Sequence, residues 1–170
     1  GESPLSGFPT EHKIVGDWRT FPFTKNDYCI AAVADCRWKM KIWEHLKDKA
    51  TFFTYIAPDA VIGKYNRIGE GSVICPGVRI TTNVEIGKCV ILNIGTQIGH
   101  DCVIGDFSSL MPSVDLGGSV KVGKNVFIGT KATLIPKISV GDNATIGAGS
   151  VVVRKVKSSV TVFGNPAKVI

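Results

Sequence analysis

A histidine and an aspartate stand side by side at positions 100 and 101, within the segment IGHDCVIGD. The carboxylate of Asp101 could accept a hydrogen bond from one ring nitrogen of His100, which would fix the tautomer and leave the other nitrogen as a general base. A glycine at position 118 leaves a backbone N–H open to close approach, as a donor to an oxyanion requires. These residue types could therefore promote attack on a carbonyl group if the fold brings them together. Without such a fold, a His-Asp pair on a turn is more often a surface pair without a catalytic role.

The sequence around these residues repeats with a period of six. One Ile, Leu or Val recurs at every sixth position from residue 56 to residue 152. The seventeen positions are Ile56, Ile62, Ile68, Ile74, Ile80, Ile86, Leu92, Ile98, Ile104, Leu110, Leu116, Val122, Ile128, Leu134, Val140, Ile146 and Val152. The next residue is Gly in ten of these hexads, which favours a corner with a positive φ or a tight turn at that glycine. A period of six fits neither an α-helix nor a hairpin, and it is typical of a β-helix solenoid.

The predicted solenoid is a three-sided prism in which each hexad forms one short strand and one corner. The large aliphatic residue points inward, and three hexads complete a coil of eighteen residues. Neighbouring coils lie about 4.8 Å apart, so residues eighteen apart in the sequence stack on one another. His100 and Gly118 then share a corner on neighbouring coils and would flank one reacting carbonyl group. The alternative interpretation is that Gly118 only makes the corner.

Composition narrows the range of partners. The 170 residues include 20 Lys plus Arg and 14 Asp plus Glu, which gives a formal net charge of +6. A basic surface can bind nucleic acid, but the sequence has neither a run of basic residues nor an aromatic-basic patch of an RNA-binding type, so we expect phosphorylated small molecules instead. The five cysteines lack CxxC spacing, and no signal peptide or membrane-length apolar run is visible. We therefore expect a cytoplasmic protein with reduced thiols and without a membrane span.

The sequence before the repeat predicts a fragment of an α/β unit. YCIAAVA, residues 28–34, is predicted as a buried parallel strand, and residues 37–50 as a helix whose apolar stripe consists of Trp38, Ile42 and Leu46. Asp35 lies between them, where it either caps the helix or contacts a substrate at the carboxyl end of the strand. A strand over 51–56 would enter the repeat, and a last strand over 160–163 would cap it. The expected parts are an α/β portion over 1–50, a β-helix over 51–156, and a cap strand and tail over 157–170.

The repeat, the segment IGHDCVIGDFSSLMPSVDLGGSVKVGKNVFIGTKATLIP and the closing FGNPAKVI resemble the left-handed β-helix acyltransferases. Within this family the chain is similar to the nucleotide-sugar N-acetyltransferases, such as those that make UDP-linked diacetamido-sugars for bacterial glycans, and to sialic acid O-acetyltransferases. The likeness covers roughly residues 28–170. It implies a mainly β fold, a left-handed parallel β-helix of hexapeptide repeats, with a small N-terminal α/β (Rossmann-like) portion that looks truncated. It also implies a homotrimer that binds acetyl-CoA, without a metal, in the groove between neighbouring prisms.

The resemblance also implies roles for individual residues. His100 would be the general base, Asp101 the carboxylate that raises its basicity, and Gly118 the N–H donor to the thioester carbonyl. The cofactor-binding residues would be Gly118, Ser109, Thr130 and Ala148. The substrate-binding residues would be Asp35 and Asn93. For Asn93 the alternative is structural, because an asparagine tolerates a left-handed corner that is usually given to glycine.

Two departures from the family's pattern concern the cofactor and the substrate. Some members carry a second histidine where this chain has Ser109. The family's N-terminal domain normally opens with a Gly-rich βαβ unit and an acidic pair that hold the sugar nucleotide, and here only the later strand and helix remain. The resemblance implies acetyl-CoA-dependent N-acetylation of the 4-amino group of a nucleotide-linked, UDP-type sugar for bacterial glycan biosynthesis. The alternative is O-acetylation of sialic acid or of another sugar.

Two other functions are possible for a β-helix: a carbonic anhydrase and a non-catalytic scaffold. A β-helix carbonic anhydrase needs three histidines for each zinc site, and the solenoid contains only His100. A non-catalytic scaffold could present rows of threonine at six- or eighteen-residue spacing. The threonines that would form such a row do not share one register slot: Thr81, Thr96, Thr130, Thr133 and Thr145. We therefore favour an acyltransferase over both alternatives.

Overall fold

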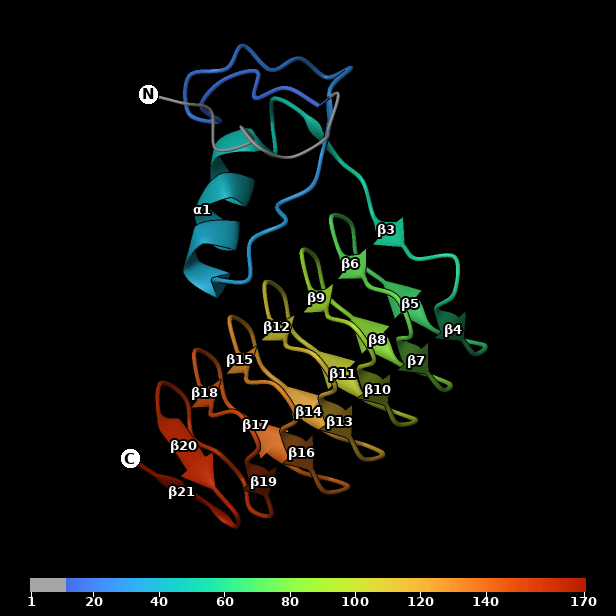
Figure 1. Ribbon diagram of the computed structural model, residues 1–170, viewed down its shortest axis with the longest axis vertical. Helices are drawn as coiled ribbons and strands as arrows, with labels where there is room; N and C mark the ends of the chain where they lie inside the picture. Colours follow the sequence, from blue (N-terminus) through green and yellow to red (C-terminus); the bar gives the residue numbers. More distant parts are fainter. Residues whose placement is uncertain (1–11) are drawn as a thin grey trace.

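The computed structural model describes residues 12–170 and consists of a long β-helix, one helix that lies along its side, and a small two-stranded sheet that precedes it in the chain (Figure 1). Each rung of the repeat forms a two-residue strand, made of the inward aliphatic residue and the residue before it. Each of these strands pairs in parallel with a strand eighteen residues away, as Ile98 does with Leu116. The predicted coil of three hexads is therefore confirmed. The first eleven residues of the predicted α/β portion lie outside the described residues.

The strands form three faces, which we number in the order in which the chain visits them. The first face contains β3 Tyr55–Ile56, β6 Val73–Ile74, β9 Ile91–Leu92, β12 Ser109–Leu110, β15 Phe127–Ile128, β18 Thr145–Ile146, β20 Thr161–Gly164 and, antiparallel to β20, β21 Ala167–Val169. The second face contains β4 Val61–Ile62, β7 Arg79–Ile80, β10 Gln97–Ile98, β13 Asp115–Leu116, β16 Thr133–Leu134 and β19 Val151–Val152. The third face contains β5 Arg67–Ile68, β8 Glu85–Ile86, β11 Val103–Ile104, β14 Lys121–Val122 and β17 Ser139–Val140. We call the turn that follows a strand of each face the first, second or third corner.

The inward aliphatic residues fill the axis of the prism. All fourteen from Ile74 to Val152 are at most 4% exposed. The first coil is less buried, and Ile56 is 43% exposed. The reason is that β3, β4 and β5 are the first strands of their sheets and have a neighbouring coil on one side only. Burial of this continuous apolar column is the main stabilising contribution to the β-helix.

The left-handed backbone positions differ from the predicted ones. Where a glycine follows the inward residue, it allows close approach between coils, since a Cβ on Gly99 would lie 2.7 Å from the Gly118 nitrogen. The left-handed residue comes two positions later, as at Asn83 (φ 56°) and Asp101 (φ 59°). The tight corner is thus confirmed, but a positive φ at the glycines of this set is wrong. Asn93 is likewise absent from the left-handed positions of the described residues.

The predicted strand before the helix is much shorter in the structure. Strand β1 contains only Tyr28–Cys29 and pairs in parallel with β2, Thr51–Phe52. Residues 30–34 leave this small sheet to reach the helix, so the predicted strand over 28–34 is wrong beyond Cys29. Its predicted burial is also wrong at Tyr28, which is 73% exposed, and at Val33, which is 37% exposed. The predicted entry strand over 51–56 is interrupted and forms β2 and β3.

Helix α1, Cys36–Leu46, packs beside the β-helix with a different face from the predicted one. Its buried residues are Cys36, Lys39, Trp43 and Leu46. The Trp43 ring lies 4.5 Å from that of Phe52 and 6.3 Å from that of Phe107 at a third corner, which docks the helix there. The predicted stripe is wrong for Trp38, whose side chain is 42% exposed. The Lys41 ammonium lies over the Trp38 ring in a cation–π contact. Helix α1 is too short and too polar to span a membrane, and the described residues contain no other candidate.

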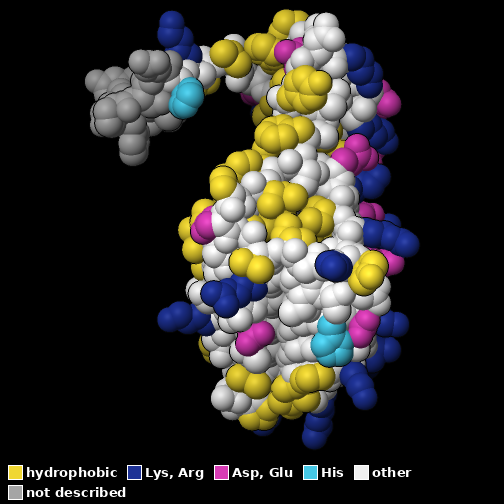
Figure 2. All heavy atoms as spheres, turned by 90° about the vertical axis from the view of Figure 1, so that its right-hand side faces the viewer, with side chains coloured by type: hydrophobic (Ala, Val, Ile, Leu, Met, Phe, Trp, Pro, Cys, Tyr) yellow, Lys and Arg dark blue, Asp and Glu magenta, His cyan; other side chains and the backbone are white. Residues whose placement is uncertain are grey.

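Charges of both signs are interleaved along the β-helix on the face drawn in Figure 2. Hydrophobic side chains gather on that face at the end that carries the last coils. Exposed residues at this end include Phe163 (54%) and Val169 (67%). On this face, basic side chains do not gather into a single patch.

Candidate active site

The second corner between β10 and β11 presents His100 and Asp101 to the outside of the prism. Their side chains are 61% and 48% exposed, whereas the residues on either side, Ile98 and Cys102, are buried in the axis. The hexad pattern explains this arrangement, because positions 98 and 102 are the two inward positions of the rung. Positions 100 and 101 can therefore carry polar groups without disturbing the core.

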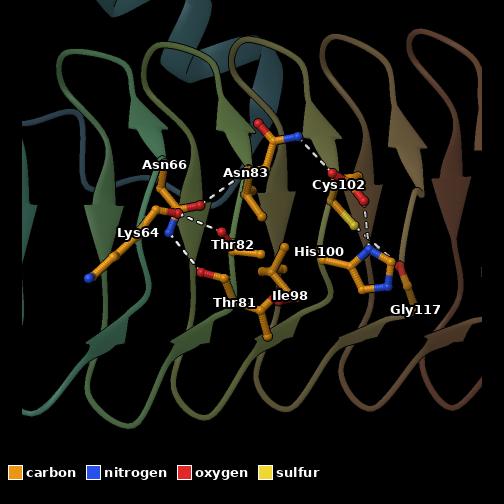
Figure 3. A network of polar contacts seen from close by, with 11 residues as sticks. Lys64, Asn66, Thr81, Thr82, Asn83, Ile98, His100, Cys102 and Gly117 are labelled. Carbon is orange, nitrogen blue, oxygen red and sulfur yellow. Dashed lines mark hydrogen bonds and ion pairs between the residues drawn. The ribbon is translucent and has the colours of Figure 1, made fainter.

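The two side chains form a hydrogen-bonded pair. His100 Nδ1 lies 2.7 Å from Asp101 Oδ2, and Asn83 Nδ2 donates to the other carboxylate oxygen, Oδ1, over 2.6 Å (Figure 3). The Asn83 amide and the His100 ring, in that order, hold the pKa of Asp101 below its ordinary value. An ionised carboxylate only accepts hydrogen bonds, so Nδ1 carries the proton and Nε2 of the neutral ring carries a lone pair. This is the tautomer that a general base at Nε2 requires.

Gly118 lies directly against this free nitrogen. A Cβ on Gly118 would be 2.5 Å from His100 Nε2, which confirms that the two residues stack at one corner on neighbouring coils. The backbone here is fixed from both sides, because Ser119 N donates to His100 O over 2.7 Å and Lys137 N donates to Gly118 O over 2.9 Å. The Gly118 N–H itself donates to no group within residues 12–170. The backbone of Gly118, with an N–H that makes no hydrogen bond in the described chain, thus lies beside the ring nitrogen that carries the lone pair.

The other predicted contact residues lie on a different edge of the prism. Thr130 and Ala148 are exposed at successive first corners, and Gly149 N donates to Thr130 O over 2.8 Å. Asn93 is also at a first corner, where its Oδ1 accepts from the N–H of Ile94 over 2.8 Å. A single chain therefore does not bring these three residues together with His100.

Ser109 has no access to a ligand. It is fully buried under α1, and its hydroxyl accepts a hydrogen bond of 2.7 Å from Lys39 Nζ. Lys39 also donates to Ser108 O over 2.9 Å, and burial lowers its pKa to about 8. We correct the prediction for Ser109 accordingly: this serine anchors the helix. Sequence reasoning missed Lys39, although its position on one helical stripe with Cys36 and Trp43 was the available signal.

Asp35 is the N-cap of α1, since its carboxylate accepts from Trp38 N over 2.9 Å. It also lines a pocket of about 350 Å³ between the start of the helix and strands β15 and β18. The pocket is lined by Asp35, Cys36, Arg37, Asn125, Phe127, Asn143 and Thr145. The buried Asn125 Oδ1 has no hydrogen-bond partner among the described residues. Both readings of Asp35 therefore stay open, because a capping carboxylate can still face a ligand. No group of three or more metal-binding side chains occurs within residues 12–170.

Comparison with known proteins gives N-acetyltransferases of nucleotide-linked amino sugars and O-acyltransferases of UDP-N-acetylglucosamine. One of the latter, acyl-[acyl-carrier-protein]--UDP-N-acetylglucosamine O-acyltransferase from Pseudomonas aeruginosa, is 34% identical over 109 residues, with 64% of this chain and 42% of that protein covered. Residues 119–154 match the family model "Bacterial transferase hexapeptide (six repeats)". A solved structure of a histidine-to-asparagine variant of perosamine N-acetyltransferase from Caulobacter crescentus, in complex with CoA and GDP-perosamine, is 34% identical, with 85% of this chain and 69% of that chain covered and a TM-score of 0.83. The acetyltransferase domain of PglB from Neisseria gonorrhoeae, in complex with acetyl coenzyme A, is 32% identical, with coverages of 82% and 68% and a TM-score of 0.78.

A curated relative, GDP-perosamine N-acetyltransferase from Escherichia coli O157:H7, is 38% identical over 63 residues. The match covers 37% of this chain and 28% of that protein. The repeat, the corner geometry and the likeness over most of the chain agree with one another. This chain therefore belongs to the hexapeptide-repeat β-helix acyltransferases.

Proposed function

We propose that the protein is an acetyl-CoA-dependent N-acetyltransferase that acts on a nucleotide-linked amino sugar in bacterial glycan biosynthesis. The observation that carries this proposal is the packing of His100 Nε2 against the backbone of Gly118, whose N–H is unused, with Nδ1 held by Asp101. A base and an oxyanion donor side by side are what acyl transfer to an amine needs. The family membership, and the nucleotide sugars and CoA named for the relatives, support the same reaction class.

The proposed reaction is direct transfer. The sugar amine attacks the thioester carbonyl carbon while Nε2 of His100 takes a proton from the amine. The Gly118 N–H donates to the oxyanion of the tetrahedral intermediate. The C–S bond then breaks, and the CoA thiolate leaves and takes up the proton from His100, so the enzyme returns to its starting state without a covalent intermediate.

The pocket beside Asp35 is our candidate for the nucleotide part of the substrate. Arg37 offers a guanidinium to a phosphate, and Phe127 offers a ring to a base. The chemistry of the pocket thus favours a nucleotide over free serine or a simple sugar.

The distribution of these groups supports an active site between subunits of a homotrimer. His100 and Gly118 lie at the second corner, whereas Thr130 and Ala148 lie at the first corner and the pocket is lined by β15 and β18 of the first face. One acetyl-CoA molecule could contact both sets if the first corner of one subunit faced the second corner of its neighbour. We propose that acetyl-CoA binds in that groove, along Thr130 and Ala148.

The test is an acetylation assay that offers acetyl-CoA with GDP-linked and UDP-linked 4-amino sugars, and with free sialic acid in parallel. We expect amide formation on one of the nucleotide sugars. His100→Ala should lower turnover about 10²- to 10⁴-fold and leave the oligomeric state unchanged in analytical ultracentrifugation. Unchanged turnover in that variant would refute the role of His100, and acetylation of sialic acid alone would favour the O-acetyltransferase.

A further inference from the structure

Asn83 is connected to the candidate active site although it lies on the coil before it. It precedes Asp101 by eighteen residues, so the two residues occupy the same position of neighbouring second corners, and both have left-handed backbone conformations. Asn83 Nδ2 donates to Asp101 Oδ1 over 2.6 Å, while Asp101 Oδ2 faces His100 Nδ1 over 2.7 Å. An amide, a carboxylate and an imidazole thus form a continuous chain along one edge of the prism (Figure 3).

We propose that Asn83 is a positioning residue for the proposed reaction, which holds His100 in its Nδ1–H tautomer by fixing Asp101. The proposal rests on the proposed function for its kinetic consequences. Asp101 is half exposed, and a surface carboxylate rotates freely about its last torsion and exchanges partners with water. The Asn83 amide occupies one carboxylate oxygen, which leaves the other oxygen directed at Nδ1. His100 and the buried Cys102 thiol are the titratable groups near Asp101 in the described chain, and burial keeps that thiol protonated by raising its pKa.

Asn83 is itself held in place by the coil before it. Asn66 Oδ1 accepts from Val84 N over 2.8 Å, and Asn66 Nδ2 donates to Thr81 O over 2.9 Å (Figure 3). The Asn83 N–H donates to Lys64 O over 3.2 Å. The backbone on both sides of Asn83 is therefore anchored, so its amide group has a defined origin from which to reach Asp101.

The contact differs from the other asparagine stack of the β-helix. Asn125 and Asn143 are also left-handed and eighteen residues apart, but their amides are 3.4 Å apart and neither is charged. The bond from Asn83 is shorter and ends on a carboxylate, which makes it charge-assisted and stronger than a bond between neutral groups. Stacking at a corner alone does not produce such a bond, so we attribute a role to this one.

The test replaces Asn83 with glycine, which adopts the left-handed conformation and removes only the side chain. The matched control is Tyr65→Gly, which alters the same corner position one coil further from His100, at a side chain that is 82% exposed. In the unliganded protein, long-range ¹H–¹⁵N spectra of the neutral His100 ring should report the Nδ1–H tautomer for the native protein and for Tyr65→Gly. Asn83→Gly should shift the ring toward the Nε2–H tautomer. Comparison with His100→Gln identifies the signals.

On the substrate that the acetylation assay identifies, Asn83→Gly should lower kcat about 10-fold, the effect of one charge-assisted hydrogen bond, with KM for acetyl-CoA unchanged. An unchanged tautomer in Asn83→Gly, or an equal change in Tyr65→Gly, would overturn the proposal. The spectroscopic result does not depend on turnover. A protein that acetylates none of the sugars would refute the proposed function, while the tautomer would still decide the role of Asn83.

Discussion

Gly118→Ala is the most direct perturbation of the proposed active site, because it adds one methyl group against the reacting nitrogen. The new Cβ would lie 2.5 Å from His100 Nε2, 2.8 Å from Cε1 and 3.0 Å from Cδ2. Van der Waals contact needs roughly 3.5 Å, so the ring must move by about 1 Å. The backbone at Gly118 is not left-handed and can accept alanine, and the ring is the side chain that yields.

This movement should affect catalysis more than stability. The 2.7 Å bond between Nδ1 and Asp101 does not survive a shift of that size unless Asp101 follows, and Asn83 holds Asp101. A displacement of about 1 Å at a catalytic group can lower turnover about 10²-fold. Alanine retains the backbone N–H, so the oxyanion donor is still present and the loss reports on His100. We expect kcat to fall by about that factor, measured as CoA thiol release at saturating substrate.

Two companion variants make the test specific. Gly117→Ala would place its Cβ 2.7 Å from Pro136 N and 2.8 Å from Pro136 Cδ, both in a rigid ring, so it should lower the midpoint of thermal unfolding, whereas Gly118→Ala should not. The double variant Gly118→Ala with His100→Ala should be no slower than His100→Ala alone, because the methyl group acts through the ring. Native turnover in Gly118→Ala would refute the geometry on which the proposed mechanism depends.

Two further predictions concern the helix and the subunits. Because burial lowers the pKa of Lys39 from 10.5 to about 8, the folded protein loses this proton at lower pH than the unfolded chain does. In urea titrations, the free energy of unfolding of the native protein should rise by about 3 kcal/mol from pH 8 to pH 10.5 relative to that of the Lys39→Met variant. If the free energies of the two proteins change equally with pH, the amine of Lys39 is not buried. His100→Ala and Ala148→Trp, each inactive alone, should regain activity in about a quarter of the sites when they are coexpressed, since a mixed trimer joins His100 of one subunit to Ala148 of the next. No recovery in purified mixed trimers would contradict an active site between subunits.

The prism and the stacking of the candidate site follow from the sequence because the repeat fixes both. An inward aliphatic residue at every sixth position determines which residues face out, and the coil of eighteen places Gly118 over His100. The packing of α1 does not follow in the same way. A lysine can bury its side chain and its amine when a carbonyl and a hydroxyl accept its hydrogen bonds. These acceptors, Ser108 O and Ser109 Oγ, lie at and just before the start of β12, some seventy residues later in the chain. No local pattern around Lys39 reveals such partners.

At two of the five left-handed positions of the second corner, Asn83 and Asp101, residues suited to the turn also suit the chemistry of the proposed site. A left-handed position favours glycine, asparagine or aspartate, whose short side chains tolerate a positive φ. At the second corner this position repeats every coil, at one strand spacing, which is within the reach of a hydrogen bond between two such side chains. Asn83 and Asp101 satisfy the backbone at φ 56° and 59° and also form the 2.6 Å bond that directs the carboxylate to His100. We therefore infer that the base needs no inserted loop, because an ordinary corner of the repeat already supplies both its carboxylate and the amide that orients it.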